Sequence, residues 1–308
     1  MADLTLHHYP NSPFAEKIRL VLGFKKLAWK SVIIPSIMPK PDLVALTGGY
    51  RRTPVLQIGA DIYCDTALIC DVLEHSQPTP TLHPLGTNGA DRIVAQWADS
   101  TLFAAAMAYC FSPKGVEFFF QGQPPAAAKA FAEDRAKMRG GASRMHSGDA
   151  TSAYRSYLRR IASMVDSQPH VLGQLPGLAD FSCYHALWFT KRIPPLAGIL
   201  DATPSLAGWM SRMAAIGHGS VEDFDASAAI AEAAKSTPAA VEKGAFQDDH
   251  GIALGSKVSV TAESFGLEPT EGELIAATRT RLSLRRSDAR AGTVHVHFPR
   301  IGFQLRKL

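Results

Sequence analysis

The chain has 308 residues, 46% of them hydrophobic and 19% charged, and its net charge of +4 is modest, so we expect a globular protein of two or three domains. No apolar run approaches the roughly 20 residues of a membrane-spanning helix, and the first ten residues lack the basic and apolar regions of a signal peptide. Four scattered cysteines without metal-ligand spacing indicate reduced thiols in a cytoplasmic protein and argue against a disulfide framework.

The first 75 or so residues alternate strand and helix signals. The expected elements are a strand at 4–9, a helix at 13–25, a strand at 29–34, an irregular segment at 35–52 with at most a short helix, a hairpin at 53–64 and a helix at 65–76. This order predicts a small α/β domain over residues 1–78, in which a crossover lets the first strands pair in parallel.

Strand signals then disappear until about residue 220. Helical patterns lie at 89–111, 125–138, 150–166, 178–190 and 204–216. An Ala-rich helix follows and should stop near Thr237 and Pro238. We therefore predict an all-α domain over residues 88–243.

The last segment has a two-residue apolar period in five short runs. These runs lie at 256–262, 272–278, 280–286, 292–298 and 302–308. They predict a small antiparallel β-barrel of SH3-like type over residues 251–308. We expect this module to be separate, so that a chain ending near residue 243 would still fold.

The same segment carries the whole net charge, with nine Lys or Arg against five Asp or Glu. A basic face with interspersed aromatic residues can bind nucleic acid, but this excess is modest, and we expect a packing role without nucleic acid. His295 and His297 share one face of a strand. No third ligand accompanies them, so no metal site is predicted.

Ser12 stands where the first helix begins, directly before Pro13. The pair is typical of a helix start, because Ser is a preferred N-cap and Pro is favoured at the first helical position. A helix N-terminus with a spare hydroxyl can also hold an anion such as a thiolate. Both interpretations, capping and catalysis, stay open at this point.

Three motifs in this order resemble the cytosolic glutathione S-transferase family. They are NSPFAEKIRLVL, RRTPVLQIGADIYCDTALICDVLE and LPGLADFSCYHAL, all within the first 220 residues. The resemblance implies a thioredoxin-like α/β domain, an all-helical domain and a homodimer, with the β segment as an addition. In the third motif Gly177 replaces the family's Ser or Thr three residues before Asp180, and we interpret Asp180 as structural.

The resemblance also implies a glutathione site. Its predicted residues are Arg52 (or its neighbour Arg51), Thr53, Pro54, Val55, Asp65 and Thr66. A cis Thr53–Pro54 bond would expose neighbouring backbone, so that Val55 pairs with the cysteinyl residue as in strand addition. Asp65 and Thr66 open a helix whose free amides suit the γ-glutamyl carboxylate. The arginine would contact the glycyl carboxylate.

Ser12 is the implied catalytic residue. A thiol titrates near pH ~8.5, and a hydroxyl that donates to the sulfur would favour the thiolate. Tyr9 and Asn11 are the alternative donors, and Tyr109 and Phe111 are candidates for the wall of an electrophile pocket. The implied activity is transfer of glutathione to small apolar electrophiles in detoxification. The alternative is a non-catalytic protein that binds glutathione or a partner, with the β segment as an interaction module.

Overall fold

The computed structural model describes residues 3–84, 86–143, 145–241 and 246–308. It contains a ten-stranded sheet with the order β10-β6-β7-β8-β9-β4-β3-β1-β2-β5. The strands are β1 (Thr5–His8), β2 (Ala28–Ile33), β3 (Val55–Ile58), β4 (Asp61–Cys64), β5 (Ser220–Asp223), β6 (Lys257–Ala262), β7 (Thr270–Ala277), β8 (Arg281–Asp288), β9 (Gly292–Pro299) and β10 (Phe303–Lys307).

The N-terminal part is the expected thioredoxin-like unit. Its helices are α1 (Pro13–Phe24), α2 (Pro41–Thr47) and α3 (Thr66–Ser76). Strand β1 pairs in parallel with β2, across the α1 crossover, and antiparallel with β3, which forms a hairpin with β4. The short helix α2 begins at a proline in a segment with few other helix signals.

The middle of the chain is helical, as predicted. Its elements are α4 (Asn88–Trp97), a π-helical turn η1 (Ala98–Leu102), α5 (Phe103–Cys110), α6 (Pro113–Phe120), α7 (Pro125–Arg139), α8 (Ser147–Val165), α9 (Leu178–Lys191), α10 (Pro194–Ala197), a 3-10 turn η2 (Gly198–Ala202) and α11 (Ser205–Ala214). Side chains of these helices share one core with α1 and α3. None of the described helices has the length and apolar character that crossing a bilayer requires.

The C-terminal strands form at the predicted places, but not as a separate closed barrel. Strand β9 runs parallel to β4, with Ile62 opposite Val296, so the five strands continue the N-terminal sheet. Closing a five-stranded barrel would need β9 to pair with β10. The edge of β9 that does not pair with β8 pairs with β4 instead, and among the described residues β10 pairs with β6 alone.

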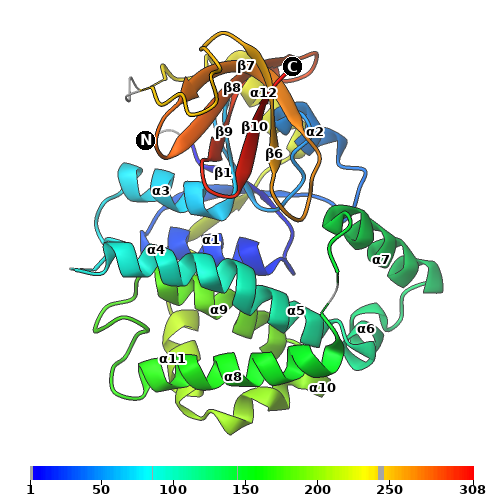
Figure 1. Cartoon of the computed structure of the whole chain (residues 1–308), viewed down its shortest axis with the longest axis vertical. Coiled ribbons are helices and arrows are strands. Elements are labelled where there is room, and N and C mark those ends of the chain that lie inside the picture. The colour runs from blue at the N-terminus through cyan, green and yellow to red at the C-terminus, as the bar shows by residue number, and fades with distance from the viewer. Residues whose placement is uncertain (1–2, 85, 144, 242–245) are drawn as a thin grey trace.

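One apolar core unites the two ends of the chain. Val55 and Ile62 belong to the same buried cluster as Leu284, Val296 and Phe298. Helices α2 and α12 (Ala226–Lys235) pack against β9 and fill this cluster. In Figure 1 the C-terminal strands, orange to red, lie with α2 at the opposite end of the molecule from α8 and α10.

Strand β5 was not expected. It runs parallel to β2 and forms one edge of the sheet, where the sequence suggested only the approach to an Ala-rich helix. All four of its residues are exposed, so the alternating apolar pattern that marks a half-buried strand is missing. The Ala-rich helix itself is α12, which ends at Lys235. The expected domain boundary at residue 243 lies outside the described residues.

Candidate functional site

Ser12 caps α1. Its Oγ accepts a hydrogen bond from the backbone N–H of Ala15 at 3.2 Å, and the residue is only 2% exposed. Among the described residues, the hydroxyl donates no hydrogen bond of its own. The capping interpretation is thus correct, and the donor role of the hydroxyl stays a prediction.

The two alternative donors are placed differently. Asn11 is exposed, and its Oδ1 accepts from Arg192, which follows α9, at 2.8 Å. Tyr9 is half-buried against the shared core, and the Lys40 ammonium lies 5.8 Å from the centre of its ring. Ser12 is therefore the hydroxyl positioned by the helix start itself.

Lys40 is the residue that the sequence did not single out. It directly precedes α2 and is 4% exposed, and its Nζ donates to the carbonyl of Arg51 and the hydroxyl of Thr53, each at 3.3 Å. No carboxylate of the described residues pairs with it. Burial, and then the nearby Arg135 and Arg51, lower the pKa of Lys40 to about 8. A buried cation without a counter-ion is a ready partner for an anionic ligand.

The Thr53–Pro54 peptide bond is cis, as expected. Val55 follows it and is fully buried in β3, opposite His7 on one side and Cys64 on the other. The register partners of Val55 thus lie on β1 and β4, and its pairing with the cysteinyl residue of a ligand stays a prediction. Thr53 and Pro54 precede β3 and lie outside the sheet, and Thr53 contacts Lys40.

Asp65 and Thr66 form the start of α3. Asp65 has φ +76°, in the left-handed region, and its Oδ1 caps the helix by accepting from Ala67 N at 3.0 Å. A non-glycine residue in this region costs about 1–3 kcal/mol, and such strain clusters at binding sites. Thr66 is 5% exposed, and its hydroxyl accepts from Lys17 Nζ at 3.3 Å.

Lys17 links this helix start to the helical part. Its Nζ also lies 2.5 Å from Asp99 Oδ2 in the π-helical turn, and Asp99 Oδ1 is 2.9 Å from His185 Nε2 on α9. Burial opposes the charge of Lys17, but the Asp99 carboxylate outweighs it and raises the pKa. Lys17 is thus a buried lysine with a counter-ion, which sequence reasoning also missed.

Arg52 is already engaged by the C-terminal segment. Its Nε and Nη2 donate to the carbonyls of Phe265 and Ser264 at 2.6 and 2.9 Å, and its Nη1 lies 3.6 Å from Asp65. We call residues Glu263–Pro269, the β6–β7 connection, the strap. The guanidinium that was expected to hold a glycyl carboxylate therefore binds the strap.

Arg51 is held in the same way. It is 5% exposed and pairs with Asp134 of α7 at 2.7 Å and with Glu268 of the strap at 2.9 Å. Gly266 of the strap donates its backbone N–H to the carbonyl of Met138 on α7 at 2.6 Å. The strap thus joins α7 to the segment that carries Thr53, and Lys40 is left as the cation without an acidic partner here.

The candidate wall of the electrophile pocket is divided. Phe111 stacks on Phe119 and lines a hollow of about 710 Å³ together with residues of α6 and of the start of α8. Tyr109 does not line this hollow. Its hydroxyl donates to Leu196 O at 3.0 Å, which makes it part of the helical packing.

His295 and His297 do share one strand, β9. His297 Nε2 lies 2.9 Å from Asp61 Oδ1, and its Nδ1 is 2.8 Å from Ser283 Oγ. Ser283 and His297 are buried, so this chain of contacts stabilises the joint between β4, β8 and β9. Among the described residues there is no group of three side chains suited to a metal ion.

Comparison with known proteins places the chain as follows. Residues 6–81 match the family described as glutathione S-transferase, N-terminal domain. A crystal structure of a GST-like protein from Pseudomonas syringae is 43% identical, with a TM-score of 0.84, and the match covers 100% of both chains. A glutathione S-transferase from Rhodospirillum rubrum shares the fold at 18% identity and a TM-score of 0.52, over 68% of this chain and 86% of its own. FtsZ-localized protein A of Caulobacter vibrioides is 24% identical over 187 residues, 58% of this chain and 74% of that protein.

Proposed function

Because this chain belongs to the glutathione S-transferase family, we propose that it binds glutathione between Ser12, Lys40, Thr53 and the start of α3, and transfers its thiolate to a small apolar electrophile. The buried ammonium of Lys40 carries the proposal, because it pairs with no carboxylate of the described residues and lies beside Thr53, next to the arginine expected to hold a carboxylate of the tripeptide. We assign it the carboxylate first expected at Arg52.

The start of α3, Ser12 and the hollow lined by Phe111 have separate roles in the proposed reaction. The amides at the start of α3, with Asp65 and Thr66, receive the γ-glutamyl end, since helix N-termini bind carboxylates. The hydroxyl of Ser12 donates to the sulfur and favours the thiolate. The thiolate then attacks the electrophilic carbon, the C–S bond forms, and the leaving group departs with its electron pair. The hollow lined by Phe111 is the proposed place for the apolar substrate.

The first test separates the two roles of Ser12. Ser12→Ala should lower turnover with glutathione and chlorodinitrobenzene by about ten- to a thousandfold, with a small effect on glutathione affinity. Ser12→Gly should lose the same activity, although Gly weakens a helix cap by only a few tenths of a kcal/mol. Ser156→Ala, an exposed serine on α8, is the control.

Turnover that falls in Ser12→Ala but survives in Ser12→Gly would make the capping bond responsible. Unchanged turnover in both variants would move the donor role to Tyr9 or Asn11. Calorimetric titration with glutathione accompanies each assay, so that loss of binding and loss of chemistry are told apart.

The second candidate function is binding of glutathione or of a partner without chemistry. The low exposure of Ser12 favours it, because an attacking thiolate must reach a hydroxyl that is only 2% exposed. Wild-type protein that binds glutathione in the calorimeter but turns over no electrophile would support this candidate. A homodimer remains part of both candidates, and sedimentation velocity of the full chain tests it.

A further inference from the structure

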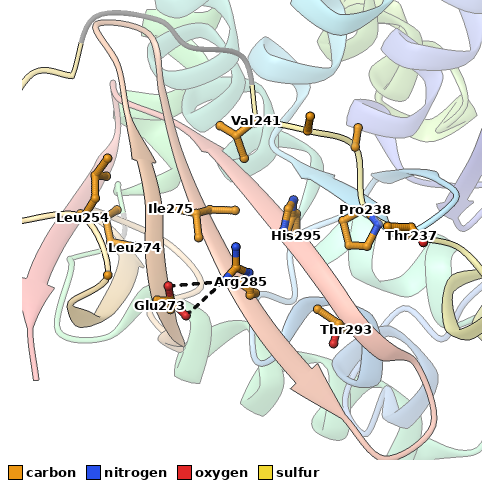
Figure 2. Close-up of a pocket in the computed structure, with 13 residues that line it drawn as sticks. Thr237, Pro238, Val241, Leu254, Glu273, Leu274, Ile275, Arg285, Thr293 and His295 are labelled. Atoms are coloured by element: carbon orange, nitrogen blue, oxygen red, sulfur yellow. Dashed lines mark hydrogen bonds and ion pairs between the residues drawn. The ribbon is translucent and has the colours of Figure 1, made fainter.

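A second hollow, of about 570 Å³, lies far along the sheet from Ser12, over β7, β8 and β9. Residues Thr237–Val241 border it on one side. Figure 2 shows Arg285 and His295 next to each other on neighbouring strands, with Ile275 nearby and Pro238 beside the histidine. No residue of the proposed glutathione site lines this hollow.

The polar floor of this hollow is a row across the strands. Glu273 is opposite Arg285 in the β7–β8 register, and Arg285 is opposite His295 in the β8–β9 register. The side chains that alternate with them, such as Leu284 and Val296, point into the shared core. The strand register therefore holds an acid, a base and an imidazole side by side on the outer face.

Arg285 is only weakly committed within this row. Its Nη1 lies 3.4 Å from each carboxylate oxygen of Glu273, and both side chains are nearly half exposed. Exposed pairs of this kind are worth little, because water solvates both partners. The guanidinium can therefore turn to an anion in the hollow at small cost.

His295 is the stronger sign of a ligand. It is 7% exposed, and its buried Nδ1 has no hydrogen-bond partner in the part of the chain that the structure describes. Asp61 Oδ1 is 3.7 Å away, and that carboxylate already accepts from His297 and from the N–H of Ala239. Burial lowers the pKa of His295, against the Asp61 carboxylate and a backbone hydrogen bond with Ala239, which raise it, so the neutral ring is favoured.

The remaining lining is mainly apolar, with Pro238, Val241, Leu254 and Ile275 around the charged row. We propose that this hollow is a second ligand site, which binds a small organic anion with an apolar body. Arg285 holds the anionic group, His295 supplies a polar contact, and the apolar side chains cover the body of the ligand. The site is independent of the proposed glutathione function.

The test uses the aromatic sulfonate 8-anilinonaphthalene-1-sulfonate, whose fluorescence rises when it is bound, with the full chain. We expect saturable binding, weakened about tenfold or more by Arg285→Ala, the usual loss for one charge-assisted hydrogen bond. Arg279→Ala is the matched control, because Arg279 is exposed and lies outside the hollow. It should leave the affinity within about twofold.

A blocking variant tests the same place by volume. Thr293 is exposed on β9 and lines the hollow, so Thr293→Trp should fill it and weaken binding while the protein stays folded by circular dichroism. Saturating S-hexylglutathione should leave probe binding intact. Probe binding that S-hexylglutathione abolishes, or that neither variant changes, would overturn the proposal, as would the absence of saturable binding up to about 1 mM. None of these results decides whether glutathione binds.

Discussion

The N-terminal region, residues 5–76, and the C-terminal strands, residues 257–307, share one sheet and one core but differ in what their side chains do. The N-terminal region holds groups that are costly for the fold, such as Asp65 with its positive φ and the buried ammonium of Lys40. The C-terminal strands direct apolar side chains such as Leu284, Val296 and Phe298 into the shared cluster. We infer that burial of the C-terminal strands raises the free energy of unfolding and offsets the destabilising effect of Asp65 and Lys40.

Removal of the C-terminal strands is the harshest test of this comparison. A chain ending at residue 250 should not fold cooperatively, because it exposes the edge of β4 and loses half of the shared core. This is the reverse of what a separate barrel implied. Circular dichroism with urea titration measures it, and a shortened chain that unfolds cooperatively and binds glutathione would restore the modular interpretation.

Phe298 offers a single-residue version of the same test. It is fully buried between Tyr50 and Phe303, at ring distances of 5.8 and 5.4 Å. Phe298→Ala should lower the free energy of unfolding by about 3–5 kcal/mol, the cost of a large cavity. Phe265→Ala on the strap, where the residue is 38% exposed, is the control and should cost far less. Equal losses of unfolding free energy in the two variants would show that Phe298 of β9 contributes no more to core stability than a partly exposed side chain does.

Substitution of Lys40 should raise the free energy of unfolding, whereas substitution of Phe298 should lower it. Its pKa is lowered from 10.5 to about 8, so the unfolded chain binds more protons between these values, and stability rises with pH across that window. Below pH 8 the charged form is destabilising, and Lys40→Met should raise the free energy of unfolding at pH 7 by up to about 3 kcal/mol. The exposed Lys307→Met is the control.

The same variant should weaken binding of S-methylglutathione by about ten- to a hundredfold. This ligand has no thiol to titrate. Wild-type affinity should fall as the pH rises above about 8, and the affinity of Lys40→Met should lack that fall. A variant that is less stable and binds normally would show that Lys40 serves the fold and no ligand.

The strap gives the smallest expected effect. Glu268→Gln removes a partly exposed partner of Arg51, which keeps its buried pair with Asp134. We expect a loss of at most about 1 kcal/mol in urea unfolding. Glu271→Gln, an exposed residue of β7, is the control. A loss several times larger would mean that the strap contributes stability that we have attributed to the shared core.

Local features were readable from the sequence where neighbours along the chain decide them. Ser12 caps α1, and Asp180 is structural as interpreted, since its carboxylate accepts from the N–H groups of Gly177 and Val171 and from Trp209. Strand β5 escaped notice because its exposed residues show no apolar period. Lys17 and Lys40 were passed over because surface lysines look the same in a sequence as buried ones.

The sequence by itself determined where the longer helices and the five C-terminal strands form, because a two-residue or 3.6-residue apolar period follows from local geometry. The short helices α6 and α10 were not predicted. Only the tertiary structure decided that β9 pairs with β4, since a strand pattern marks the buried face and leaves the neighbour at each edge open. The tertiary structure also decided which lysine and arginine side chains pair with a carboxylate or a carbonyl. Arg52 meets the strap more than two hundred positions away, Lys17 meets Asp99, and Lys40 meets no carboxylate among the described residues.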